Sequence, residues 1–169
     1  MEFKTGQILN FAYNDSLFEK LIKFVTKSKY IHSGIITSVG PDFIEIAEAL
    51  SRGFVISNYE RWWVEGKIKE GVISIGESKS PLINVRDIAL KYQGTPYGFM
   101  TILHIANYLI FRKKAFWSDG TKSLICSEAV ARILYDASDK KINFETEYNK
   151  SYDEITPGDL ERSKQIKWL

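Results

Sequence analysis

The chain has 169 residues and a net charge of +2, with 44% hydrophobic and 26% charged residues. This length is typical of one domain and is sufficient to bury a core without disulfide bonds. The balanced charge gives no support for a nucleic-acid partner or for binding to an anionic membrane. We therefore expect a single folded domain over residues 1–169 that does not bind nucleic acid.

The chain contains a single cysteine, which excludes an intrachain disulfide and with it the framework of small secreted domains. The N-terminal residues lack the basic start and apolar core of a signal peptide. The longest apolar stretch, 101–111, includes His104 and Asn107 and is much shorter than the ~20 residues that span a bilayer. We therefore expect no stable membrane insertion and a cytoplasmic location, for a cellular protein or for one encoded by a phage or virus.

In the N-terminal part, the sequence predicts a strand over 6–12 that ends at the turn-forming residues 14–16. Apolar residues at helical spacing then predict a helix over 17–26. Two apolar, β-branched segments, 30–37 and 43–49, flank a Gly-Pro-Asp turn and predict an antiparallel hairpin.

The rest of the chain adds short strands and longer helices. Two further strands are predicted over 53–57 and 71–75, and the aromatic residues between them are expected to form a helix or loop laid on the sheet, with Tyr59, Trp62 and Trp63. Helices are predicted over 85–92, 101–116 and 126–137, and the remainder to 169 is polar and turn-rich. These elements predict an α+β domain in which helices pack against a small antiparallel sheet.

Cys126 is the strongest candidate for chemistry because it begins the predicted helix over 126–137. A thiol at a helix N-terminus meets the positive end of the helix dipole, which lowers its pKa and favours the nucleophilic thiolate. Backbone N–H groups at the same end can bind the oxyanion of an attacked carbonyl. Two points favour a plainer role: a lone cysteine is often a small buried hydrophobe, and the negative Glu128 lies within one turn.

A thiol nucleophile needs a base, and the chain has two histidines. His104 lies in an apolar helical segment, which suits a core or helix-surface residue. His32 lies in an apolar strand beside Gly34, which leaves room for a close approach. A Cys–His pair that is distant in sequence and adjacent in the fold is the usual arrangement for this chemistry. His32 is therefore the expected base, and a structural histidine is the alternative.

The second nitrogen of the base needs an acceptor, and the return strand of the hairpin offers Glu45 and Glu48. Their odd spacing places them on opposite faces of a regular strand, so at most one can face His32, and the period alone does not choose between them.

Tyr97, after a Gly-Thr-Pro turn, and Tyr13 are candidates to line a pocket or to bind an oxyanion, with packing as the alternative. No phosphate loop, HExxH pair or CxxC pair is present, so we expect no cofactor and no metal.

Six segments, taken in order, resemble the circularly permuted NlpC-like papain-fold hydrolases, a group with YiiX-like bacterial proteins, a poxvirus branch and the more distant lecithin–retinol acyltransferases. They correspond to the family's G-D-I-L strand, H-x-G-I strand, E-A…G-V segment, G-x-P-Y turn, C-S-E-L-V helix start and closing P-x-D-L. In this chain they are Gly6-Gln7-Ile8-Leu9, His32-Ser33-Gly34-Ile35, Glu48-Ala49 with Gly53-Phe54-Val55, Gly94-Thr95-Pro96-Tyr97-Gly98, Cys126-Ser127-Glu128-Ala129-Val130 and Pro157-Gly158-Asp159-Leu160.

This resemblance implies a permuted papain-like domain, with a small sheet or half-barrel packed against helices and the nucleophile at a helix N-terminus. It implies Cys126 as nucleophile, His32 as base and Glu48, in preference to Glu45, as the orienting residue. The order is informative, because His precedes Cys here, whereas papain and unpermuted NlpC proteins place Cys first. Gln7 departs from the family, which often has Asp at this position.

The resulting hypothesis is a cysteine hydrolase that cleaves an amide or ester bond through an acyl-enzyme, with a peptide or a lipid-linked acyl group as the substrate class that the resemblance implies. A thiol acyltransferase would use the same site with a second nucleophile in place of water. A catalytically silent binding module with the same fold is the main rival.

The basic end of the apolar segment 101–114 also allows a membrane-surface role. The residues Tyr59, Trp62 and Trp63 are candidates for a lip around an apolar substrate or for core packing.

Overall fold

The computed structural model describes residues 1–12, 23, 28–98 and 122–169. Within these residues the fold is α+β and contains a six-stranded sheet in the order β4-β3-β2-β1-β5-β6, with every neighbouring pair antiparallel. The strands are β1 (Ile8–Phe11), β2 (His32–Val39), β3 (Phe43–Leu50), β4 (Gly53–Glu60), β5 (Ile73–Ser78) and β6 (Ile166–Trp168). The described helices are α2 (Arg61–Lys69), α3 (Val85–Leu90), α5 (Cys126–Ala137), α6 (Phe144–Tyr148), α7 (Pro157–Arg162) and the 3₁₀ turn η1 (Tyr152–Glu154). None of these helices is long and apolar enough to cross a bilayer.

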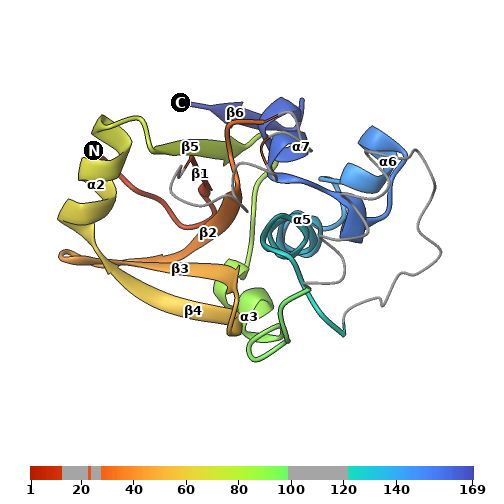
Figure 1. Cartoon of the computed structure of the whole chain (residues 1–169), viewed down its shortest axis with the longest axis horizontal. Coiled ribbons are helices and arrows are strands. Elements are labelled where there is room, and N and C mark those ends of the chain that lie inside the picture. The colour runs from red at the N-terminus through yellow and green to blue at the C-terminus, as the bar shows by residue number, and fades with distance from the viewer. Residues whose placement is uncertain (13–22, 24–27, 99–121) are drawn as a thin grey trace.

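The sheet is strongly curved, with α2 on one side and α5 on the other (Figure 1). Three strands separate β4 from β5 in the sheet, yet both contact α2. The sheet must therefore curl so that β4 and β5 both reach the same helix. Two hydrophobic clusters follow from this curl, one between the sheet and α5 and one inside the curl.

Alternation along the strands assigns side chains to the two clusters. On β3, Ala47 and Ala49 pack toward α5, whereas Ile44 and Ile46 point into the curl. A period of two residues puts neighbours on opposite faces, so a polar residue in β3 is committed to one cluster or the other. This parity decides where the two glutamates of β3 lie.

Several predicted elements are confirmed. The hairpin of 30–37 and 43–49 is the β2–β3 pair, and the helix predicted over 126–137 is α5. The strand predicted over 6–12 is β1, β4 and β5 extend beyond their predicted ends, and α3 ends at Leu90. Of the aromatic segment, Tyr59 belongs to β4, whereas Trp62 and Trp63 belong to α2. The helix predicted over 101–116, and that over 17–26 except Lys23, lie outside the described residues.

The prediction that the C-terminal part is merely polar and turn-rich is wrong. It contains α6, η1, α7 and β6, and it contributes Phe144, Ile155 and Leu160 to the core against α5. These elements are too short to develop a hydrophobic period, but their caps are readable in the sequence. Thr156 accepts a hydrogen bond from the Asp159 N–H, and Pro157 occupies the first turn of α7, as helix starts favour.

We predict that Gly53→Ala destabilises the fold more than Gly71→Ala does. Both glycines have positive φ values, 107° and 73°, so alanine strains both. At Gly53 a Cβ atom would also lie 2.8 Å from the Thr95 carbonyl oxygen, whereas at Gly71 it would meet nothing within 4 Å. We expect an extra loss of about 1–3 kcal/mol in the unfolding free energy of Gly53→Ala, measured by urea denaturation. Equal losses would contradict a close contact between the β3–β4 turn and the 94–98 segment.

Candidate active site

The register of β2 and β3 brings His32 and Glu48 together. Gly34 is paired with Glu48, and His32 lies two residues earlier on the same face, so the two side chains are diagonal neighbours. The His32 Nε2 atom lies 2.7 Å from the Glu48 Oε2 atom. Gly34 makes this possible, because a Cβ atom there would lie 2.8 Å from the Ile46 Cγ2 atom and 3.5 Å from the Glu48 Cβ atom. The space that the sequence predicted beside His32 is therefore present.

Glu45 lies on the opposite face of β3 and has other partners. Its carboxylate accepts hydrogen bonds from Arg86 Nε at 2.8 Å and from Thr37 Oγ1 at 2.8 Å. The bond from Arg86 is the largest cause of a lowered pKa for Glu45. The choice between the two glutamates that the strand period left open is therefore made by the register, which gives Glu48 to His32.

Cys126 begins α5 and is 4% exposed. The His32 ring and the backbone N–H groups of Ser33 and Ser127 lie close enough to the Cys126 thiol to lower its pKa. Because Nε2 of His32 is occupied by Glu48, Nδ1 is the nitrogen left for the thiol. The thiol comes from the α5 side of the sheet and meets His32 at the first residue of β2.

The electrostatics of this pair favour a thiolate beside an imidazolium. Burial alone would raise the pKa of the Cys126 thiol, but the charge of His32, its hydrogen bond and the two backbone N–H groups together lower it. Burial alone would lower the pKa of His32, but the charges and hydrogen bonds of Cys126 and Glu48 raise it to about 10. Each group therefore stabilises the charged form of the other, as expected for opposite charges in contact.

Glu128 is fully buried in the first turn of α5 and is a potential obstacle to a thiolate. Its carboxylate lies 2.9 Å from Arg132 Nε and accepts a 3.4 Å bond from the Ile125 N–H. Burial raises the pKa of Glu128 to about 7, against the opposing effect of Arg132. Its negative charge near Cys126 is therefore partly lost by protonation and is compensated by an arginine.

A buried polar chain supports the strand that carries His32. Asn10 is fully buried, accepts a 2.6 Å hydrogen bond from the Ser33 hydroxyl and donates a 3.2 Å bond to the Pro157 carbonyl oxygen. Ser127, beside the thiol, donates its hydroxyl to the Ile155 carbonyl oxygen at 2.6 Å. The C-terminal segment thus holds both sides of the Cys–His contact. The roles of Asn10 and Ser33 were not predicted from the sequence, where the available signal was a polar residue in each of two apolar strands.

Tyr59 is a second partner of Glu48, since its hydroxyl donates a hydrogen bond to Oε1. Its ring stacks on Trp63, and both rings pack against the cluster inside the curl. The lip role suggested for this aromatic segment is therefore replaced by core packing for Tyr59 and Trp63. Trp62, in contrast, is 69% exposed.

Tyr97 lies close to the thiol. It forms a parallel bridge with Leu124, two residues before Cys126. Its pKa is raised, first by burial and then by the negative charge of Cys126. Tyr13 and His104, the other sequence candidates, lie outside the described residues.

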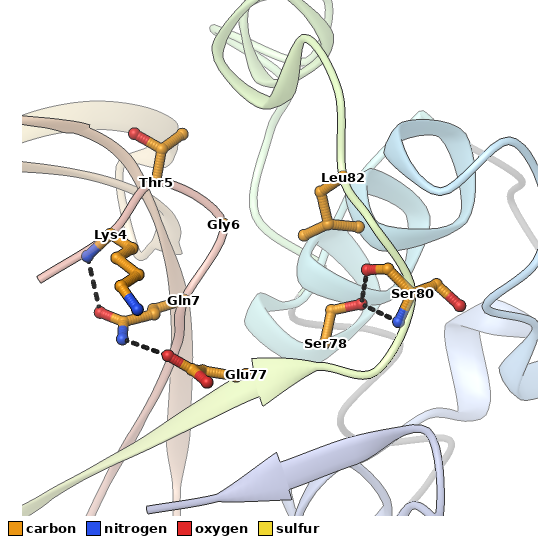
Figure 2. A pocket seen from close by; sticks show the side chains of 8 residues that line it. All are labelled: Lys4, Thr5, Gly6, Gln7, Glu77, Ser78, Ser80 and Leu82. Atoms are coloured by element: carbon orange, nitrogen blue, oxygen red, sulfur yellow. Dashed lines mark hydrogen bonds between the residues drawn. The ribbon is translucent and has the colours of Figure 1, made fainter.

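A pocket of about 220 Å³ lies apart from the Cys–His pair, and neither Cys126, His32 nor Glu48 lines it. Figure 2 shows its wall, where the Gln7 amide donates to Glu77 at 3.0 Å and its oxygen accepts from the Lys4 N–H at 2.9 Å. Gln7, which departs from the family pattern, therefore links the start of β1 to β5. It is not among the described contacts of the thiol.

Comparison with solved structures finds YiiX. The crystal structure described as metalloprotein YiiX from Escherichia coli O157:H7, DUF1105, has a TM-score of 0.65 and 16% sequence identity over 98% of this chain and 96% of its own. No family model matches the sequence. No curated protein matches it either. The chain therefore shares the fold of YiiX, which agrees with the YiiX-like part of the resemblance found in the sequence.

We predict that Asn10→Ala destabilises the protein because it leaves the buried Ser33 hydroxyl and Pro157 carbonyl without their partner. Each buried polar group left unsatisfied costs about 1–3 kcal/mol, so the loss in unfolding free energy should exceed that of Ser38→Ala on the exposed side of β2. Chemical denaturation measures both variants. An Asn10→Ala protein as stable as Ser38→Ala would contradict a supporting role for this chain.

Proposed function

We propose that the protein is a cysteine hydrolase that cleaves an amide or ester bond, with Cys126 as nucleophile, His32 as base and Glu48 as the residue that orients His32. The observation that carries the proposal is the 2.7 Å contact between His32 and the buried Glu48 carboxylate, beside a Cys126 thiol whose pKa the charge of His32 lowers. His32 and Glu48 come from the two strands of one hairpin, and Cys126 comes from a helix much later in the sequence. Nucleophile, base and orienting acid are thus in the order that this chemistry requires.

The reaction divides into two steps. The Cys126 thiolate attacks the carbonyl carbon, and the imidazolium of His32 gives its proton to the leaving amine or alcohol as the carbon–heteroatom bond breaks. Water then attacks the thioester, His32 takes its proton, the acid leaves, and the thiolate–imidazolium pair is restored. In this mechanism, backbone N–H groups in the first turn of α5 would stabilise the oxyanion, with Tyr97 as a candidate second donor.

The permuted papain-like relationship is part of the proposal. The order His32, Glu48, Cys126 along the chain is that of the permuted NlpC-like proteins, and the fold shared with YiiX agrees with this relationship. The resemblance suggests a peptide or a lipid-linked acyl group as substrate. An acyltransferase would follow the same first step and then use a second nucleophile in place of water.

YiiX is described as a metalloprotein, so the residues here bear on whether a metal fits. Across the described ranges, no three His, Cys, Asp or Glu side chains are grouped so that they could hold a metal ion. The proposed steps are written with protein groups, and the experiment below includes a chelator.

The test is the pH dependence of Cys126 alkylation by iodoacetamide, followed by mass spectrometry of the folded protein. The lowered thiol pKa predicts rapid labelling well below the ordinary thiol pKa of ~8.5. In His32→Ala the compensating charge is lost and burial remains, so labelling at pH 6.5 should slow on the order of 10- to 100-fold and recover only at alkaline pH. Addition of EDTA should leave the wild-type rate unchanged.

Glu48→Gln should slow labelling at pH 6.5 in the same direction, whereas Glu45→Gln, the matched change on the other face of β3, should not. The rival binding module predicts an unreactive thiol in the wild-type protein. Labelling that is the same in wild type and His32→Ala would refute the Cys–His pair. A rate that rises with EDTA would point to a metal on the thiol instead.

A further inference from the structure

Tyr59 reaches the proposed catalytic residues through Glu48. Its hydroxyl donates to Glu48 Oε1, whereas Glu48 Oε2 faces His32. We propose that Tyr59 is a positioning residue that locks the Glu48 carboxylate in the orientation that His32 needs. This inference rests on the proposed function, since it assigns Tyr59 a part in the same site.

The buried carboxylate of Glu48 needs hydrogen-bond donors for both of its oxygens. Its side chain is 2% exposed, so the carboxylate has little water with which to satisfy its two oxygens. A buried carboxylate is costly unless its oxygens receive hydrogen bonds. His32 satisfies one oxygen and Tyr59 satisfies the other, so the carboxylate plane is held at both ends. Loss of the Tyr59 hydroxyl would leave one buried oxygen free to seek another donor, and the carboxylate would turn away from His32.

The position of Tyr59 in β4 requires a long side chain to reach Glu48. Glu48 is paired with Val55 and Ile44 with Tyr59, so Tyr59 approaches Glu48 from four residues further along β4. Both side chains point into the curl of the sheet, and a long side chain with a terminal donor is needed to cover this separation. Tyrosine meets both requirements, whereas phenylalanine would fill the same space without the donor.

The Tyr59 ring is anchored by a neighbouring aromatic side chain. It stacks on Trp63 of α2, with ring centroids 5.6 Å apart and an interplanar angle of 26°. Because α2 contacts both β4 and β5, the ring is fixed by the element that holds the sheet curled. A donor held in this way gives Glu48 a fixed partner rather than a mobile one. The curl of the sheet is thereby coupled to the orientation of His32.

The chemical consequence concerns the thiolate–imidazolium pair. A displaced Glu48 would stabilise the imidazolium of His32 less, and the thiolate of Cys126 would lose part of its compensating charge. The labelling rate of Cys126 falls on the acid side of its pH profile as the thiolate is protonated. In Tyr59→Phe this fall, the acid limb of the profile, should therefore move to higher pH. A purely structural role would change the unfolding free energy without moving this limb.

The experiment is a double-mutant cycle on the rate and pH profile of iodoacetamide labelling, with wild type, Tyr59→Phe, Glu48→Gln and the double variant. In the wild-type background, Tyr59→Phe should slow labelling at pH 6.5 by about 3- to 30-fold, the effect of a lost hydrogen bond to a charged group. In the Glu48→Gln background the same change should have an effect of less than about twofold, because Tyr59 acts through the carboxylate. Circular dichroism and thermal unfolding verify that each variant is folded.

Tyr92→Phe is the matched control. It removes a tyrosine hydroxyl bonded to Asp136, which lies ten residues after Cys126 on α5, about 15 Å along the helix axis. Labelling should be unchanged in this variant. An equal effect of Tyr59→Phe in both Glu48 backgrounds, or no effect in the wild-type background while Glu48→Gln slows labelling, would overturn the role of Tyr59 and leave the proposed function standing. If neither His32→Ala nor Glu48→Gln changes labelling, the proposed function itself fails.

Discussion

The hydrogen bond between His32 and the buried carboxylate of Glu48 is the interaction on which the rest of the site depends. A buried carboxylate is tolerated only when it is paired and hydrogen-bonded, and here the β2–β3 register supplies that pairing through the gap left by Gly34. Once Glu48 occupies Nε2, the other nitrogen of His32 is directed to the thiol. This contact fixes the orientation of the ring, whereas the pKa of His32 is raised first by the charge of Cys126 and then by Glu48.

The thiol reaches this histidine because the C-terminal segment fixes both partners. Asn10 joins the Ser33 hydroxyl to the Pro157 carbonyl, and Ser127 joins the start of α5 to Ile155. The backbone N–H of Ser33, next to His32, also helps to lower the pKa of the Cys126 thiol. Packing of η1 and α7 against α5 therefore supports the site, although neither element contacts the thiol directly among the described interactions.

Much of this arrangement was predictable from local pattern. The hairpin, the helix that begins at Cys126 and the nomination of His32 follow from period-two and helical spacing together with the scarcity of histidine. The choice of Glu48 over Glu45 required either a family resemblance or the register, because alternation alone separates the two without ranking them. Asn10 contacts a residue 147 positions away in the sequence, and Tyr59 contacts one 11 positions away. Whether such residues meet depends on how the chain packs and the sheet curls, which local spacing does not predict. The C-terminal elements were missed because each spans too few residues to show a repeating hydrophobic period.

The central claim is that Cys126 and His32 form a thiolate–imidazolium pair at neutral pH. NMR titration of the imidazole nitrogens measures this directly, and the chain has only two histidines to assign. The account predicts that His32 stays protonated through neutral pH and titrates near 10 in the wild-type protein, and that its pKa falls markedly in Cys126→Ala. A His32 ring that titrates near its ordinary pKa of ~6.5, and does so equally with and without the thiol, would contradict it.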